Sequence, residues 1–323
     1  MPSQPDIDTL VAQALDGQFG APLGDGLWGQ VYDVPGGLTG GLPGGLPGGL
    51  AGGAGESQGK VLKLSRTDGG IGDGRDLIRR EAAALTFFDG YRGEDLALPA
   101  YYGHGEFDQL RAGFSCWLLM DQLPGERMYE ARYKAMSRDQ RLALSTALGR
   151  GLASYHRLSL DRSEARPNRD ALLAESRRDW LFDEIMHELP VTEQVTAKRL
   201  RARYRQLLAE CQEPVLAHGD VNPTNLLFAD AGPIALVDFA ESGWDLPAVD
   251  FAHWVTLGWL DDTVVAAYQD AGGPLIDDQV LGVVGAINAM IGLVLDRRLG
   301  DEAAVKRGEG SLLTCLERAG LVG

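Results

Sequence analysis

The sequence has few residues that bind metals through sulfur or nitrogen. Its 323 residues include three cysteines and five histidines. Cys116, Cys211 and Cys315 lie far apart, with no CxxC pair and no metal-type spacing to a histidine. This pattern excludes a disulfide framework and a metal site built on cysteine pairs. We expect three reduced, buried thiols.

Signals for export or membrane insertion are also missing. The first residues, Met1 to Asp6, provide neither a basic start nor an apolar core, so they do not resemble a secretion signal. The longest uncharged apolar run, Val280 to Leu295, is shorter than a bilayer requires and is interrupted by glycine and asparagine. We expect a cytoplasmic protein without a membrane span, in which this run forms a buried helix.

The sequence has few basic residues relative to acidic ones. The chain has 46 acidic residues against 30 lysines and arginines, a formal net charge of −16. Nucleic-acid backbones are held by clustered basic side chains, so we expect no nucleic-acid partner. A cationic substrate is compatible with this charge, although solubility alone also explains it. The length is sufficient for two lobes, and the sequence leaves the oligomeric state open.

Residues 36–55 repeat a four-residue unit, GGLT-GGLP-GGLP-GGLA-GGAG. Collagen requires glycine at every third position, so a collagen helix is excluded. Ordering so much glycine costs backbone entropy that a few leucines cannot offset. Because residues 30–34 and 60–64 both have strand patterns, we expect residues 36–59 to be a flexible insertion at the tip of an enlarged hairpin. A role as a binding tail stays open.

The remaining pattern changes from mixed to helical along the chain. Helical spacing predicts a helix from residue 76 to 88, and residues 98–123 are rich in strand patterns. The sequence at 122–125, Gln-Leu-Pro-Gly, then breaks the pattern as a connector between lobes would. Helices are predicted over 137–210, with breaks at Pro167 and Pro190, and again after the polar segment described next.

The strongest chemical signal is the segment His218-Gly-Asp-Val-Asn-Pro-Thr-Asn225, followed by a buried-strand pattern that ends at Asp238. Asp220 and Asn225 lie five residues apart on one turn. One carboxylate can receive or orient a hydroxyl proton, while an amide and a second carboxylate can hold Mg²⁺ against nucleotide phosphates. Each residue alone also has a purely structural explanation, and it is their joint spacing that predicts phosphoryl transfer.

A second set of residues lies near the amino terminus. Gly24, Gly26 and Gly29 match the pattern GxGxxGxV, in which glycines let the backbone close over phosphates. Lys63 follows on a predicted strand, and Glu81 lies on the next helix at a separation suited to an ion pair. A Rossmann dinucleotide site is disfavoured, because a strand rather than a helix follows these glycines.

Together these residues resemble the aminoglycoside phosphotransferase and choline kinase group, over nearly the whole chain. The resemblance also includes residues 118–125, residues 153–158 and Gly243 to Ala252, where the family's GDPxxDLA segment has one residue inserted before Pro247. Eukaryotic-type protein kinases would instead have arginine in place of Gly219, DFG at Asp238-Phe-Ala, and a long activation segment ending in APE.

The resemblance implies an α+β, bilobal protein-kinase-like fold. Residues 1–122 would form a small N-lobe built on an antiparallel sheet, which binds the nucleotide. Residues 123–323 would form a larger, mainly helical C-lobe that carries the catalytic loop and the acceptor-binding helices.

The resemblance also implies roles for individual residues. Asp220 would be the catalytic carboxylate, Asn225 and Asp238 would bind Mg²⁺, and His218 and Asp250 would brace the catalytic loop. The nucleotide, ATP or GTP, would be held by the glycine loop, by Lys63 with its partner Glu81, and at its base by the backbone of Asp121, Gln122 and Leu123. His156 also fits the family, and we interpret it as a histidine that packs between helices.

The resemblance further implies that the acceptor is a small molecule with a hydroxyl group. Asp261 and Asp262 are the candidates to meet a cationic acceptor, with Glu184 and Glu188 behind them, and Trp254 and Trp259 could line the same cleft. An aminoglycoside or another amino-sugar fits, as do choline, homoserine, a thioribose, fructosamine or a macrolide. Two other classes stay open, a nucleotide-binding regulator without transfer activity and a protein-modifying kinase.

Overall fold

The protein divides into two compact units. The first comprises Met1–Tyr91 and Leu98–Pro124, and the second comprises Arg92–Ala97 and Gly125–Gly323. The computed structural model describes residues 4–16, 18, 22–26, 29–34, 59–66, 73–111, 113–162, 173, 176–229 and 232–321. The expected N-lobe of residues 1–122 contains residues 92–97, which here cluster with the second unit because β4 (Leu96–Ala97) pairs in parallel with β10 (Ile234–Leu236).

The first unit is built on a five-stranded antiparallel sheet in the order β1-β2-β3-β6-β5. Its strands are β1 (Gly24–Gly26), β2 (Gly29–Val34), β3 (Lys60–Arg66), β5 (Tyr101–Arg111) and β6 (Phe114–Asp121). β2 and β3 pair as far as Val34 opposite Lys60, which confirms the two strands predicted on either side of the glycine repeat. The repeat itself lies outside the described residues.

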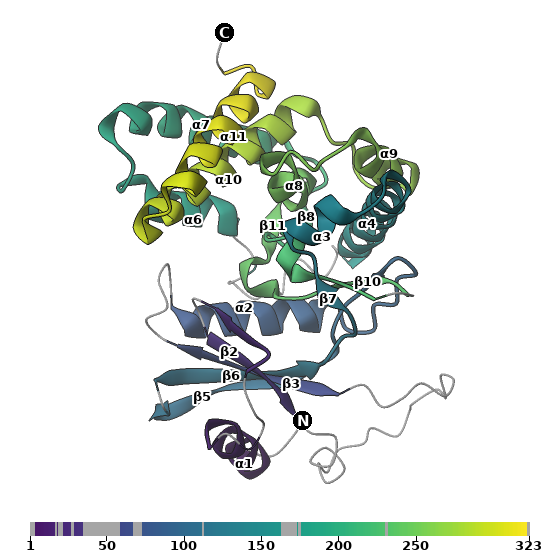
Figure 1. Ribbon diagram of the computed structural model, residues 1–323, viewed down its shortest axis with the longest axis vertical. Helices are drawn as coiled ribbons and strands as arrows, with labels where there is room; N and C mark the ends of the chain where they lie inside the picture. Colours follow the sequence, from purple (N-terminus) through teal and green to yellow (C-terminus); the bar gives the residue numbers. More distant parts are fainter. Residues whose placement is uncertain are drawn as a thin grey trace. The chain divides into compact units, whose positions relative to one another are not determined.

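Two helices cover opposite faces of this sheet, α1 (Gln4–Leu15) and α2 (Gly74–Phe87) (Figure 1). Leu62 and Leu64 of β3 share a buried cluster with Leu10 and Val11 of α1. Because successive side chains of a strand alternate between its faces, Lys63 projects from the other face, toward α2. The strand pattern thus decides which helix can pair with Lys63.

Short strands and turns of 3-10 helix carry the central part of the second unit. β4, β10, β9 (Leu226–Phe228) and β7 (Glu126–Arg127) form one sheet in that order, and β8 (Val215–Ala217) pairs with β11 (Gly243–Asp245). The turns are η3 (Pro223–Asn225), η4 (Phe239–Glu241) and η5 (Pro247–Phe251). These elements fix both ends of the polar segment from His218 to Asp238.

Helices make up the rest of the second unit (Figure 1). They are α3 (Glu130–Ala135), α4 (Arg138–Asp161), α6 (Arg177–Met186), α7 (Val191–Glu210), α8 (Ala252–Thr256), α9 (Asp262–Asp270), α10 (Asp278–Leu299) and α11 (Glu302–Arg318). Ser137 and Gln140 form a capping box that starts α4. The predicted break at Pro190 is confirmed, since Pro190 caps α7, whereas the one at Pro167 lies outside the described residues.

The apolar run predicted as a buried helix is α10. By length and composition it is the one helix in the described part of the chain that could cross a bilayer, but 72% of its most apolar window is buried inside the protein. It packs against α7, α8 and α11. The prediction of a buried core helix is confirmed.

The cysteine prediction holds for two positions and fails at the third. None of the three cysteines, all of which the structure describes, is in a disulfide, and Cys116 and Cys315 are buried. Cys211 is only partly buried, because it is the C-cap of α7, where the chain leaves the helix.

Candidate active site

A tight loop after β8 brings Asp220 and Asn225 together. Nδ2 of Asn225 donates to Oδ2 of Asp220 at 2.8 Å and to the backbone oxygen of Asp220 at 3.0 Å. Asn222 caps η3 by accepting the N–H of Thr224 at 2.8 Å, and its own Nδ2 donates to Oδ2 of Asp220 at 3.0 Å. Because Nδ2 of Asn225 donates to Asp220, its Oδ1 is the atom that could bind a cation.

Asp238 follows β10 in an unusual backbone conformation. Its φ is 70°, and it is the one non-glycine residue with positive φ in the described part of the chain. The N–H of Val237 donates to the backbone oxygen of Asn225 at 3.0 Å, so the two segments run side by side here. A left-handed conformation at a residue other than glycine is costly and is usually retained at functional sites.

The amide oxygen of Asn225 and the carboxylate of Asp238 are suitable ligands for Mg²⁺. This ion takes oxygen ligands, and in nucleotide-binding enzymes it uses one or two carboxylates together with phosphate oxygens and water. The described residues contain no group of three or more His, Cys, Asp and Glu side chains that could hold a metal alone. An amide oxygen plus one carboxylate fits an ion that arrives with a nucleotide.

Asp250 braces the start of the loop that carries Asp220. Its Oδ1 accepts the N–H of Gly219 at 2.8 Å, and its Oδ2 accepts the N–H of His218 at 3.0 Å. Burial alone would raise the pKa of Asp250, but the hydrogen bonds from His156 and from the N–H of Gly219 lower it. Sequence reasoning missed this contact of His156, which is buried in α4 as predicted but also touches Asp250 directly.

The imidazole of His218 connects the loop to the chain before Asp238. Its Nδ1 accepts the N–H of Asp220 at 3.2 Å, so the proton of the neutral ring lies on Nε2, 3.1 Å from the backbone oxygen of Val237. Burial lowers the pKa of His218, which favours this neutral form. One ring therefore connects the loop that carries Asp220 to the chain just before Asp238.

Gly219 cannot be replaced without moving the backbone. Its φ is +84°, and a Cβ atom there would lie 2.2 Å from the backbone oxygen of Glu241. Both the conformation and the close approach require glycine.

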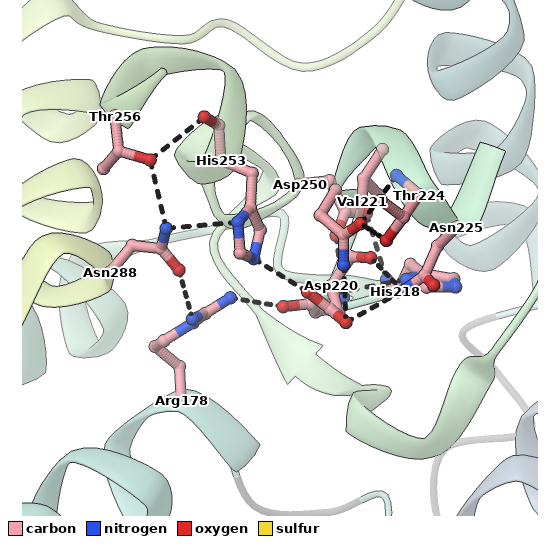
Figure 2. A network of polar contacts seen from close by, with 12 residues as sticks. Arg178, His218, Asp220, Val221, Thr224, Asn225, Asp250, His253, Thr256 and Asn288 are labelled. Carbon is pink, nitrogen blue, oxygen red and sulfur yellow. Dashed lines mark hydrogen bonds and ion pairs between the residues drawn. The ribbon is translucent and has the colours of Figure 1, made fainter. Parts of the chain in front are cut away.

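Sequence reasoning missed a set of residues on the other side of Asp220 (Figure 2). Nε2 of His253, in α8, lies 2.7 Å from Oδ1 of Asp220. Asn288 in α10 approaches Nδ1 of the same ring at 3.4 Å, and Arg178 in α6 donates to Oδ1 of Asn288 at 2.8 Å. A lone histidine in a short helix carries no sequence signal, and its partners come from helices far along the chain.

The surroundings of Asp220 keep it ionised. Burial acts to raise its pKa, but the hydrogen bonds from His253 and from the amide of Asn222 together hold the pKa well below its ordinary value. The side chains of Asp220 and His253 each remain 27% exposed. Asp220 is thus a carboxylate that both accepts hydrogen bonds and can be reached from outside.

In the first unit, Lys63 and Glu81 form the expected ion pair. Nζ of Lys63 lies 2.6 Å from Oε2 of Glu81, with the side chains 12% and 0% exposed. Glu81 comes from α2 and Lys63 from β3, on the face that the strand alternation selects. A buried carboxylate of this kind fixes the direction of the lysine ammonium.

The glycine pattern forms the β1–β2 hairpin, with Gly26 opposite Gly29 and Gly24 opposite Val31. At Gly29 the backbone of β3 is so close that a Cβ atom would lie 1.9 Å from the oxygen of Leu64. This contact gives Gly29 a packing role. The turn residues 27 and 28 lie outside the described residues.

The segment expected to receive the nucleotide base is partly occupied by contacts within its own unit. The N–H of Asp121 donates to Ala100 and that of Gln122 donates to Gly59, each at 2.9 Å. The carboxylate of Asp121 accepts the hydroxyl of Tyr102 at 2.6 Å. Of the three expected residues, Leu123 is the one whose N–H has no acceptor among the described residues.

The acidic candidates for acceptor binding differ in their partners. Asp261 caps α9 by accepting the N–H of Val264 at 3.1 Å and also accepts the hydroxyl of Ser145. Glu188 is paired with Arg298. Asp262 and Glu184 are exposed, and within the described residues neither makes an ion pair. Two of the four carboxylates therefore already have structural roles.

The two tryptophans also differ. Trp254 is fully buried, and its Nε1 donates to the backbone oxygen of Val221 at 3.0 Å. Trp259 is half-buried and stacks on Tyr133 of α3, with ring centroids 4.1 Å apart. Of the two, only Trp259 could present a ring face or edge to a ligand.

Solved structures of low sequence identity share this fold. An aminoglycoside phosphotransferase, APH(2″)-IIIa, in complex with GDP and kanamycin is 13% identical with a TM-score of 0.62, over 96% of this chain and 98% of that chain. Macrolide 2'-phosphotransferase type I is 14% identical with a TM-score of 0.54, over 97% and 98%. Macrolide 2'-phosphotransferase MphH from Brachybacterium faecium is 17% identical with a TM-score of 0.52, over 94% and 98%.

These likenesses confirm the predicted α+β, kinase-like fold. Curated proteins give no match. The family model described as "Phosphotransferase enzyme family" matches residues 54–282, which is well over half of the chain and includes Lys63, Glu81 and the whole segment from His218 to Asp250. The chain therefore belongs to the phosphotransferase enzyme family, as a small-molecule phosphotransferase whose acceptor is a hydroxyl group.

Proposed function

We propose that this enzyme transfers the γ-phosphoryl group of ATP or GTP to a hydroxyl of a small acceptor, with Asp220 as the catalytic carboxylate. The observation that carries the proposal is the environment of Asp220. It is an ionised, partly exposed carboxylate held by donors on both oxygens. One of these donors is the amide of Asn225, whose backbone oxygen accepts the N–H of Val237, the residue before Asp238.

Asp220 acts on the acceptor hydroxyl. Its carboxylate accepts the hydroxyl proton as the hydroxyl oxygen bonds to the γ-phosphorus and the bond from that phosphorus to the β–γ bridging oxygen breaks. A low pKa makes Asp220 a weak base, so its main contribution is to orient the hydroxyl for in-line attack. Catalysis here consists mostly of positioning and electrostatics.

The nucleotide and its metal are held by residues with separate tasks. Lys63, oriented by Glu81, binds the α- and β-phosphates, and the hairpin with Gly24, Gly26 and Gly29 covers them. Oδ1 of Asn225 and the carboxylate of Asp238 bind Mg²⁺, which neutralises phosphate charge when bound. Leu123 donates its N–H to the purine, with Asp121 and Gln122 shaping the backbone around it.

The acceptor is a small hydroxyl compound, and cationic acceptors such as aminoglycosides and amino-sugars are favoured. The net charge of −16 supports this preference. Asp262 is the better of the two aspartates proposed to meet a cation, because Asp261 caps α9. The structure solved with GDP and kanamycin and the macrolide enzymes supply two acceptor classes to test first. We propose a cytoplasmic location for this reaction.

A panel of acceptors tests the function. Kanamycin, gentamicin, streptomycin, a macrolide, choline, homoserine and casein would each be incubated with ATP or GTP, with and without Mg²⁺. We expect transfer to at least one small hydroxyl compound, loss of transfer without Mg²⁺, and no transfer to casein. A protein-modifying kinase would show the reverse preference, and a nucleotide-binding regulator would bind ATP without any transfer.

The role of Asp220 has its own test. Asp220→Ala should abolish phosphoryl transfer while the nucleotide Kd stays close to that of the wild type, because the proposed role of Asp220 is on the acceptor hydroxyl and not on the nucleotide. Asp139→Ala, which removes an exposed carboxylate at the start of α4, is the matched control and should leave turnover unchanged. Equal turnover by the wild type and Asp220→Ala would overturn the assignment.

A further inference from the structure

His253 is the only described contact of Oδ1 of Asp220, at 2.7 Å. The other carboxylate oxygen, Oδ2, accepts two amide donors, Asn222 at 3.0 Å and Asn225 at 2.8 Å. A carboxylate has about four lone-pair positions, two on each oxygen. Both positions on Oδ2 are therefore filled, and the position left for an acceptor hydroxyl is on Oδ1, beside the His253 ring.

The proton position on His253 follows from its neighbours. Arg178 is buried, and its guanidinium can only donate, so Oδ1 of Asn288 must be the acceptor in their 2.8 Å contact. Nδ2 of Asn288 then faces Nδ1 of His253 at 3.4 Å and Oγ1 of Thr256 at 3.3 Å, and both of these must accept.

The hydrogen bonds of the Thr256 hydroxyl are consistent with this assignment of donors and acceptors. Because Oγ1 accepts from Asn288, its own proton is free to donate, and it lies 3.0 Å from the backbone oxygen of His253. Each contact in the chain from Arg178 to His253 therefore pairs one donor with one acceptor (Figure 2). Nδ1 of the ring carries the lone pair, and the proton of the neutral ring lies on Nε2, facing Asp220.

We propose that His253 is a positioning residue for phosphoryl transfer, held as the neutral Nε2–H tautomer by Arg178 and Asn288. By donating to Oδ1 of Asp220, it fixes the carboxylate so that the remaining position on Oδ1 meets the acceptor hydroxyl. Arg178, Asn288 and His253 thus form a relay of hydrogen bonds to Asp220. A second hydrogen bond from Arg178, to the backbone oxygen of Gly219, connects this relay to the loop that carries Asp220. This inference rests on the proposed function of Asp220.

The fixed tautomer also determines which atom receives the proton of the acceptor hydroxyl. Since Nε2 already carries a proton, the ring cannot take the proton of the acceptor hydroxyl, and that proton goes to Oδ1 of Asp220. His253 positions the carboxylate, whereas Asp220 orients the acceptor hydroxyl and receives its proton.

Nuclear magnetic resonance of the ring nitrogens tests the tautomer without any acceptor. In the full-length protein at neutral pH, the ¹⁵N signals of His253 should show a protonated Nε2 and an unprotonated Nδ1, assigned from the signal lost in His253→Leu. In Asn288→Asp the carboxylate can no longer donate to Nδ1, and Nδ1 should become protonated. An Nδ1–H tautomer or a fully protonated ring in the wild type would overturn the relay.

Kinetics test the positioning role with the acceptor of highest turnover in the panel. His253→Leu keeps most of the side-chain volume but removes the donor, and kcat should fall about 10- to 100-fold, as for loss of a hydrogen bond to a charged group. The nucleotide Kd should not change. His253→Gln places an amide donor near the position of Nε2 and should recover most of the kcat. His187→Leu, at an exposed histidine, is the control.

The outcomes separate the two proposals. Wild-type kcat in His253→Leu, or an equal loss in the Leu and Gln variants, would contradict the positioning role while leaving Asp220 catalytic. A wild-type enzyme that transfers to no acceptor would refute the proposed function, and the resonance measurement alone would then decide whether the relay exists.

Discussion

Nε2 of His156 lies 2.9 Å from Oδ2 of Asp250, and both side chains are fully buried. Since Asp250 is ionised and can only accept, the ring must donate, while its Nδ1 contacts the hydroxyl of Tyr268 at 2.7 Å. Asp250 in turn holds the N–H groups of His218 and Gly219. Asp250 thus connects α4 to the loop that carries Asp220.

Replacing His156 by phenylalanine should therefore weaken both the fold and the catalytic loop. The ring shape is kept, but a buried carboxylate loses a donor, and we expect a loss of about 1–3 kcal/mol in the free energy of unfolding together with a lower kcat. Urea unfolding and steady-state kinetics would measure the two effects. Tyr268→Phe removes only the outer contact and should cost less; equal costs would contradict this order.

Glu81→Gln should impair nucleotide use. The amide keeps the volume but no longer holds the ammonium of Lys63 by charge, so we expect kcat/KM for ATP to fall about 10- to 100-fold. The exposed pair of Arg150 and Asp95 provides the control, because Arg150→Gln breaks a surface ion pair that should contribute little. If both variants behaved alike, the buried pair would have no special part in binding phosphates.

Asp245 should make the stability depend on pH in the direction opposite to a salt-bridged carboxylate. Burial raises its pKa to about 6, although the hydroxyls of Ser176 and Tyr204 donate to it. The folded state then holds this proton more tightly than the unfolded chain. The contribution of the protonated Asp245 to the free energy of unfolding is complete below about pH 4 and is lost as the pH rises through about 6.

The comparison of wild type with Asp245→Asn isolates this titration. Between about pH 4 and 7 the wild type should lose on the order of 3 kcal/mol of unfolding free energy relative to the variant, from a pKa difference of about 2. Urea unfolding across this pH range measures the difference. Asp139→Asn should show no such change, and a constant difference between wild type and Asp245→Asn would show that the carboxyl does not titrate there.

Replacing residues 36–55 by a short turn should leave folding and turnover nearly unchanged. β2 and β3 already pair up to Val34 and Lys60, and a shorter connection reduces the closure entropy by about 1 kcal/mol. Thermal unfolding and kcat of the shortened enzyme would be compared with those of the full chain. Loss of activity with normal folding would assign the repeat a part in function.

The sequence was sufficient to predict those parts of the candidate site that lie close together along the chain. Asp220, Asn225 and Asp238 fall within one loop–strand unit, and Lys63 and Glu81 lie on successive elements, so spacing alone relates them. The strand alternation that aims Lys63 at α2 could also be predicted. All of these relations join residues that are close along the chain, or follow from the alternation of side chains in a strand.

The relay behind Asp220 could not be predicted in this way. His253, Asn288 and Arg178 come from three helices, and Arg178 and Asn288 are 110 positions apart. A single polar residue on a helix face does not reveal its tertiary partner. The capping role of Asp261, by contrast, was foreseeable, since an aspartate just before an apolar helical pattern is a start signal.

Gly219 separates this enzyme from eukaryotic-type protein kinases more firmly than one letter of sequence suggests. An arginine at this position, as those kinases have, would need its Cβ in the space occupied by the backbone oxygen of Glu241. Admitting it would displace the turn that follows Asp238, so a single substitution cannot convert one loop into the other. An evolutionary path between the two types must change both segments together.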